Sequence, residues 1–156
     1  MITFRKFLFT VFVVFSLFLM SLIALTQIER PTIFYDSYAD IVRKNGFQNG
    51  WVPLWIPESV RNIHESHDID TNERWLSFTL SKADKFNPEA CHPIKKENAM
   101  LPRKRTFNLF SSFVHKMEKD LATNPHLSFF CCDQSRDGYL AINGQRDYAY
   151  FWHLGH

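Results

Sequence analysis

The chain has 156 residues and a formal net charge of +2 at neutral pH. This excess is concentrated at the start of the chain: without Arg5, Lys6, Glu29 and Arg30, the 18 basic and 16 acidic residues become 15 of each. Residues 31–156 are enough for one domain and too few for two. A neutral domain lacks the basic surface on which nucleic-acid binding depends. We therefore expect a single small domain that does not bind nucleic acid.

Residues 7–25 form an almost uninterrupted apolar run, FLFTVFVVFSLFLMSLIAL. As a helix, a run of this length measures roughly 28 Å, close to the ~30 Å hydrocarbon core of a bilayer. Two basic residues precede the run, so the positive-inside rule places residues 1–6 in the cytoplasm and residues 31–156 across the membrane. We predict a single-pass signal anchor at residues 7–26 in a bacterial inner membrane, followed by a periplasmic domain. The alternative is a cleaved secretory signal, whose apolar region is usually shorter.

Two short helices are predicted at the start of the exported domain. The stretch DSYADIVRKNG (36–46) begins with capping residues and ends in glycine. Its inward-facing residues are expected to be Tyr38, Ile41 and Val42. Pro57 suits the first position of a second helix that runs to about His67. Between the two, the prolines of NGWVPLWIP (49–57) exclude regular structure.

Four strands and one longer helix are predicted in the rest of the chain. The strands are expected at 73–81, 126–133, 138–143 and 147–154. In the first, alternation places Arg74, Leu76, Phe78 and Leu80 on one face. The helix is expected at 106–125, where Phe107, Phe110, Val114, Met117 and Leu121 recur at helical spacing. Residues 83–105 hold three prolines and are expected to be irregular, with at most one turn of helix after Asn87-Pro88.

The fold class predicted from these elements is α+β. An N-terminal transmembrane helix precedes a small domain in which an antiparallel four-stranded meander packs against two or three helices on one face. Asp-Gly and Asn-Gly pairs between the last three strands favour short hairpins.

The chain contains three cysteines, Cys91, Cys131 and Cys132. An oxidising compartment permits one disulfide among them. Neighbouring residues of a strand point to opposite faces, so Cys131 and Cys132 cannot both reach Cys91 easily. A disulfide of Cys91 with either one is predicted, and the choice stays open.

The segment WIPESVRNIHESHDIDTNERW (55–75) concentrates imidazoles and carboxylates. On the predicted helix His64 and His67 share one face, and imidazole with carboxylate suits zinc. A metal site would therefore use His64, His67, Asp68 and Asp70. The histidine spacing is not that of the zincin motif, and the segment does not satisfy the EF-hand pattern. The competing interpretation is a structural turn, in which Asp68 to Asn72 satisfy the backbone groups of a loop.

No catalytic residues are predicted, because the sequence contains no nucleophile elbow, phosphate-binding glycine loop or dinucleotide fingerprint. Trp51 and Trp55 are candidates for the wall of a binding groove. With Trp75 they make three aromatic residues, and three aromatics beside prolines more often form a packed core.

The stretch GWVPLWIPESVRNIHESHDIDTNERW (50–75) resembles a motif of small bacterial exported proteins with a YbbD-type head domain, and residues 148–152 resemble its closing strand. The fitting positions are Trp51, Pro53, Pro57, Ser59, Ile63, Glu65, His67, Asp70, Thr71 and Asn72. Val60 departs from the alanine that is common there. The resemblance implies an exported α+β domain with no known activity. It also makes Glu65, His67, Asp70 and Asn72 a recurring polar set, which a turn or a site explains equally well.

The function predicted from the sequence is that of a non-enzymatic, membrane-anchored envelope protein whose periplasmic domain binds another envelope protein. An immunity protein that neutralises a toxin is one form of such a domain. The candidate binding residues are Trp51, Trp55, Glu65, His67, Asp70 and Asn72. The alternative function is a metal-dependent hydrolase or a small-ligand-binding domain that uses the cluster from His64 to Asp70. No cofactor is expected apart from that metal.

Overall fold

The computed structural model describes residues 2–29, 31–81, 90–102, 112–132, 138–145 and 147–155. The chain divides into two compact units, Met1–Pro31 and Thr32–His156. The first unit is the helix α1 (Ile2–Glu29), in which Phe4–Leu22 is long and apolar enough to cross a membrane. A secretory signal shares this property, so α1 is a candidate membrane anchor by its length and composition.

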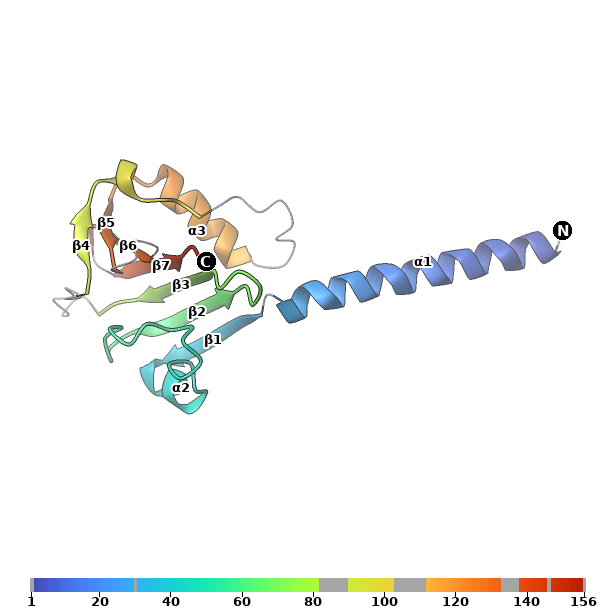
Figure 1. Cartoon of the computed structure of the whole chain (residues 1–156), viewed down its shortest axis with the longest axis horizontal. Helices are drawn as coiled ribbons and strands as arrows, with labels where there is room; N and C mark the ends of the chain where they lie inside the picture. The colour runs from blue at the N-terminus through green and yellow to red at the C-terminus, as the bar shows by residue number, and fades with distance from the viewer. Residues whose placement is uncertain are drawn as a thin grey trace. The chain divides into compact units, whose positions relative to one another are not determined.

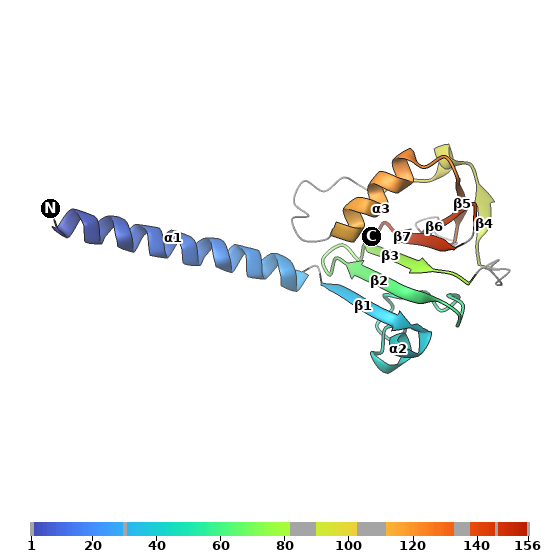
Figure 2. The same ribbon diagram turned by 180° about the vertical axis from the view of Figure 1, so that it is seen from behind.

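The second unit is built on a seven-stranded antiparallel sheet with the order β1-β2-β3-β7-β6-β5-β4. Its strands are β1 (Thr32–Ser37), β2 (Arg61–His67), β3 (Arg74–Thr79), β4 (His92–Ile94), β5 (Leu127–Cys131), β6 (Gly138–Asn143) and β7 (Tyr148–His153). The helical elements are α2 (Tyr38–Arg43), the short 3₁₀-helix η1 (Lys96–Asn98) and α3 (Ser112–Thr123). In both ribbon views α2 lies beside β1, and α3 runs along the other half of the sheet (Figures 1 and 2).

Each face of the sheet supports its own hydrophobic core. On one face α3 buries Val114, Met117 and Leu121 against an aromatic layer that includes Phe129 and Trp152. On the other face, α2 and the irregular segment 44–60 cover a second core. Its members include Tyr35, Ile41, Val52, Ile56, Ile63, Leu76, Phe78 and Phe151. The expectation that helices would cover a single face is therefore wrong, because an irregular segment covers the second face.

The α+β class is confirmed, and all four predicted strands are present as β3, β5, β6 and β7. The predicted alternation of β3 is also correct, since Leu76, Phe78 and Leu80 are buried in one core and Trp75 in the other. The strand count is wrong, however, because the sheet has seven strands rather than four. The additional strands are β1, β2 and β4.

The segment predicted as a second helix is the strand β2. Ile63, Glu65 and His67 are buried on one face with period two, as a strand requires, and Ser66 between the last two is buried as well. Two of these three are polar, so the hydrophobic pattern does not show the alternation. A bulge at Asn62, which has a φ of 51°, shifts the register between Arg61 and His64 and also interrupts the pattern.

Several other expectations concern the ends and interiors of elements. Residues 83–105 were expected to be irregular with at most one helical turn; the short η1 is such a turn, but the strand β4 was not expected. Val42, expected to face inward, is 54% exposed, whereas Ile41 is buried. Positions 82–89, 103–111, 133–137 and 146 lie outside the described residues. The expected contributions of Phe107 and Phe110, and most of the Asp-Gly link, fall there.

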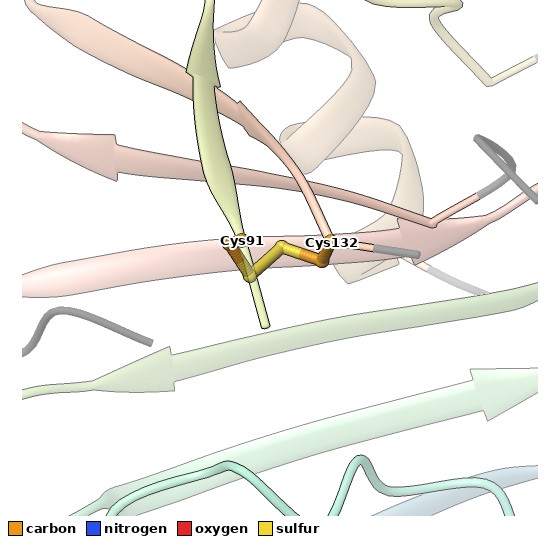
Figure 3. Close-up of a disulfide and its surroundings, with 2 residues drawn as sticks. All are labelled: Cys91 and Cys132. Atoms are coloured by element: carbon orange, nitrogen blue, oxygen red, sulfur yellow. A yellow bond between two sulfur atoms is a disulfide. The ribbon is translucent and has the colours of Figure 1, made fainter. Parts of the chain in front are cut away.

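The disulfide joins Cys91 to Cys132, with an S–S distance of 2.08 Å (Figure 3). The register explains the choice between the two partners. His92 pairs with Cys131, so Cys91 lies opposite Cys132 where β4 and β5 adjoin. Cys132 belongs to the core under segment 44–60, while Cys131 points into the core under α3. Adjacent cysteines on opposite faces leave only one within reach of Cys91.

The edge of the sheet at β1 is closed by side chains from α2 and the residue that follows it. Lys44 Nζ donates a hydrogen bond to the carbonyl of Phe34 at 2.9 Å, and the backbone N–H of Asp36 donates to Asp40 Oδ2 at 3.3 Å. These outward backbone groups would otherwise be a template for another strand. Hydrogen bonds from Lys44 and Arg43 lower the pKa of Asp40 against the opposing effect of burial, so the carboxylate stays charged.

Gly46 lies where segment 44–60 turns back over β1. A Cβ atom there would lie 2.8 Å from Ile41 Cγ2 and 2.9 Å from the Tyr35 hydroxyl, whereas the nearest atom at Gly144 would be 3.4 Å away. We expect Gly46→Ala to lower the free energy of unfolding by about 1–3 kcal/mol through overpacking, and Gly144→Ala to have a smaller effect. Thermal unfolding of the full chain in mild detergent measures both. Equal losses in the two variants would contradict the close packing at Gly46.

Candidate functional site

Three residues of the predicted binding set meet on the face of the sheet that segment 44–60 covers. Glu65 and His67 are neighbouring inward positions of β2, with side chains that are 0% and 4% exposed. His67 Nδ1 lies 2.7 Å from Glu65 Oε1. The indole of Trp51 stacks on the His67 ring, with centroids 3.7 Å apart and planes 4° from parallel. Trp51 therefore covers a buried imidazole–carboxylate pair.

Burial raises the pKa of Glu65, against the hydrogen bond from His67 and the positive charges of His67 and Arg74, which lower it. Its second oxygen, Oε2, is buried without a hydrogen-bond partner among the described residues. Tyr35 lies nearby, and burial, followed by the charges of Glu65 and Asp40, raises its pKa to about 12. Burying the Glu65–His67 pair costs free energy of desolvation. Its mutual hydrogen bond and the nearby positive charge offset this cost.

Asp68 and its neighbours form the turn that joins β2 to β3. Asp68 Oδ1 accepts hydrogen bonds from the backbone N–H groups of Asp70 at 3.1 Å and Thr71 at 3.2 Å. The N–H of Asp68 in turn donates to the carbonyl of Glu73 at 2.9 Å. Asp70 and Asn72 are exposed, and Asn72 has a φ of 56°. The structural interpretation predicted for this segment holds for Asp68, which organises a hairpin.

The proposed metal ligands do not converge. Because β2 is a strand, His64 and His67 lie on opposite faces of the sheet, and the helical premise that placed them together is wrong. His64 instead contacts the rings of Phe34 and Phe113, at centroid distances of 4.9 and 5.6 Å. Among the described residues, no three His, Cys, Asp or Glu side chains are placed to hold a metal ion. The geometry gives the metal hypothesis no support.

Trp55, the second candidate tryptophan, packs edge-on against Phe151 at 5.3 Å and borders the core. Trp51 and Asn72 instead line a cavity of about 250 Å³ together with Arg74 and His153. The sequence analysis did not select Arg74 or His153 as site residues. The sequence pattern could nevertheless have indicated Arg74, because it is the one charged residue on the apolar face of the alternating strand β3.

A larger groove lies on the opposite face, between α3 and the strands β2, β3 and β7. It has a volume of about 690 Å³. Its lining includes Asn62 and His64 from β2, Ser77 and Thr79 from β3, Tyr148 and Tyr150 from β7, and Phe113, Lys116, Lys119, Asp120 and Thr123 from α3. We call this feature the α3 groove. Sequence reasoning missed it, because its two walls are distant in the chain.

The polar groups of the α3 groove are organised around Asp120. The hydroxyl of Tyr148 donates to Asp120 Oδ2 at 3.0 Å and accepts a hydrogen bond from Asn124 Nδ2 at 3.0 Å. Burial raises the pKa of both Tyr148 and Tyr150, and contacts with Asp120 raise it further, so both are protonated donors. Lys116 and Lys119 are exposed on α3. The groove thus combines aromatic surface, hydroxyl groups and a cationic rim.

The family relationship concerns the first half of the sheet. Residues 29–79 match the YbbD head domain. The resemblance recognised at residues 50–75 is therefore confirmed, and the YbbD head segment comprises β1, α2, the irregular segment, β2 and β3. The similar stretch at 148–152 lies beyond the matched residues. Neither the curated proteins nor the solved structures include a significant match to this chain.

The YbbD head segment contributes Trp51, Glu65, His67, Asn72 and Arg74 to the features described above. It contributes only the β2 and β3 wall of the α3 groove, whereas α3 and β7 lie outside it. The groove is therefore made jointly by the matched segment and by the second half of the domain.

Proposed function

We propose that this protein is a membrane-anchored, extracytoplasmic binding domain without enzymatic activity, which captures an acidic segment of another envelope protein in the α3 groove. The observation that carries this proposal is the groove itself, a cavity of about 690 Å³ that presents aromatic, hydroxyl and ammonium groups. Pockets of this size with a few convergent polar groups are the usual place for a ligand.

Two features support the proposed extracytoplasmic location of the domain. The apolar helix α1 is a candidate anchor, and the basic residues that precede its apolar run favour a cytoplasmic N-terminus. The disulfide between Cys91 and Cys132 supports an oxidising compartment for the domain. Both fit a periplasmic domain on a single-pass protein.

The charge of the groove favours an acidic occupant. The carboxylate of Asp120 already accepts a hydrogen bond from Tyr148, while Lys116 and Lys119 extend into solvent on the same helix. Complementary charges mainly increase the rate of encounter and exclude wrong partners. A strand added at the β1 edge is a poorer mode of binding, because Lys44 and Asp40 occupy its outward backbone groups.

The test is site-specific photo-crosslinking in intact cells that produce the full-length chain. A photoreactive residue at Thr123, which is exposed and lines the groove, is expected to capture one specific protein. The same probe at Gln48, which is exposed on segment 44–60, serves as the matched control. Capture at neither position, or equal capture at both, would contradict the proposal.

Charge reversal separates a specific occupant from random contact. With the probe kept at Thr123, we expect Lys116→Glu together with Lys119→Glu to weaken capture about tenfold or more, because like charges would then meet. Both lysines are exposed, so folding is expected to change little. An adduct unaffected by the reversal would exclude an acidic partner.

A further inference from the structure

A second cavity, which we call the Trp51 pocket, lies at the end of the sheet where the β2–β3 turn approaches the C-terminal end of β7. It has a volume of about 250 Å³ and is lined by Asn49, Gly50, Trp51, Asn72, Arg74 and His153. This volume is sufficient for several water molecules or for the end of a small ligand. It shares no lining residue with the α3 groove.

The polar side chains of the Trp51 pocket are chiefly hydrogen-bond donors. Arg74 supplies a guanidinium, which is always charged. His153 Nδ1 accepts the backbone N–H of Gly155 at 3.1 Å, so a neutral ring would carry its proton on Nε2. Asn49 and Asn72 add carboxamides, and no acidic residue is among the described residues that line the pocket. Donors and positive charge without a carboxylate favour an anionic group.

Two walls of the pocket are held in place by the surrounding structure. Trp51 is fixed by its parallel stack on the His67 ring. Arg74 Nη1 donates a hydrogen bond to the carbonyl of Gly50, which anchors the guanidinium to segment 44–60. Preorganised groups bind a ligand without losing further side-chain freedom, which increases affinity. A guanidinium held beside an indole suits a planar carboxylate with a small apolar body.

The buried carboxylate of Glu65 explains why Arg74 lies at this position. Its charge couples to Arg74, but Glu65 does not line the cavity and its Oε1 is bonded to His67. Arg74 therefore offsets an interior charge and at the same time contributes its guanidinium to the cavity surface.

From these observations we propose that the Trp51 pocket binds a carboxylate group, with Arg74, His153 and Asn72 as donors and Trp51 as the apolar wall. The size of the cavity matches the carboxyl-terminal end of a peptide or a comparable small acid. The proposal is independent of the α3 groove and of any protein partner bound there.

The test uses the full-length chain in detergent micelles, with N-acetylalanine, its amide and inorganic phosphate as probes. The readout is the set of indole N–H resonances of the tryptophans and the Arg74 side-chain resonance. N-acetylalanine is expected to shift the Trp51 and Arg74 signals and to bind at least ten times more tightly than its amide. Equal binding of acid and amide, tighter binding of phosphate, or no shift at concentrations on the order of 10 mM would overturn the proposal.

Variants assign the effect to the pocket. Asn72→Asp places a negative charge at the mouth of the cavity on an exposed turn residue, in a backbone conformation that aspartate tolerates. We expect it to weaken binding of N-acetylalanine about tenfold while the other resonances stay in place. Arg74→Gln is expected to abolish binding. Arg61→Gln, an exposed arginine on β2, is the matched control and should bind like the wild type. Weaker binding of N-acetylalanine to Arg61→Gln, or unchanged binding to Asn72→Asp, would contradict the assignment to this pocket.

Discussion

Replacing His67 with alanine is expected to lower the free energy of unfolding by about 3–5 kcal/mol at neutral pH. The substitution removes the hydrogen bond to Glu65 Oε1, and Oε2 already lacks a partner among the described residues, so a fully buried carboxylate is left with neither oxygen bonded. The stack of Trp51 on the His67 ring is lost as well. Equilibrium unfolding of the full chain in detergent, followed by tryptophan fluorescence, measures the loss.

His64→Ala is the matched control, because it removes the same side chain from the same strand on the opposite face. His64 is half-buried and makes ring contacts with Phe34 and Phe113, so its loss should cost about 1 kcal/mol. Similar losses in the two variants would contradict the placement of Glu65 and His67 inside the core. If His67→Ala had nearly the same free energy of unfolding as the wild type, the buried Glu65–His67 pair would be excluded.

The loss in His67→Ala is expected to depend on pH in a definite direction. Burial raises the pKa of Glu65 in the folded state above its usual value, and His67 opposes this rise. Without His67, the folded-state pKa rises further. The stability contributed by a group with a raised pKa is fully present below the unfolded-state pKa and is lost as the pH rises through the folded-state value. The difference between variant and wild type should therefore be smallest near pH 4, where the lost Trp51 stack still contributes, and should grow toward neutral pH. A difference that grows on acidification instead would contradict the assignment to Glu65.

Removal of the disulfide is the second change expected to have a large effect. Cys91 and Cys132 are 41 positions apart in the chain, so a crosslink between them restricts the unfolded ensemble and stabilises the fold by about 3–4 kcal/mol. The double variant Cys91→Ala with Cys132→Ala should lose this amount, which is expected to lower the melting temperature by several degrees per kcal/mol. Thermal unfolding by circular dichroism, with and without a reducing agent, is the measurement.

Cys131→Ala provides the control for the disulfide prediction. Cys131 is buried under α3 and lies outside the disulfide, so its replacement should cost about 1 kcal/mol through lost packing. A reductant should destabilise the wild type and Cys131→Ala by similar amounts and leave the double variant unchanged. Sensitivity of the double variant to reductant would show that Cys131 takes part in a crosslink.

Local sequence was sufficient for elements whose hydrophobic pattern follows their geometry. The strands β3, β5, β6 and β7 show this pattern. In α3, Val114, Met117 and Leu121 were correctly expected to be buried. The apolar run near the N-terminus and the motif shared with the YbbD head domain were likewise recognised from the sequence, since both depend on residue identity alone.

The strand β2 and its buried polar pair could not be predicted from the sequence, because polar residues that are buried do not contribute to a hydrophobic pattern. Glu65 and His67 are polar, yet they occupy inward positions of β2 because each is the hydrogen-bond partner of the other. A hydrophobic pattern counts them as surface residues, and the bulge at Asn62 removes the remaining alternation. A helix was predicted where a strand forms, and the metal hypothesis followed from that error.

The amino-acid sequence by itself determined the apolar anchor candidate, the α+β class, four of the strands, the cysteines available for a disulfide and the match of residues 29–79 to the YbbD head domain. Only the tertiary structure decided the rest, because those features depend on pairing between distant segments. Strand register selected Cys132 over Cys131, and the crossing of β2 by segment 44–60 placed Trp51 on His67. The packing of α3 against β3 and β7 created the groove, and the pairing of β3 with β7 brought Arg74 beside His153. Contacts between residues this far apart in the chain depend on the free energy of the whole fold. They therefore cannot be predicted from a local sequence pattern.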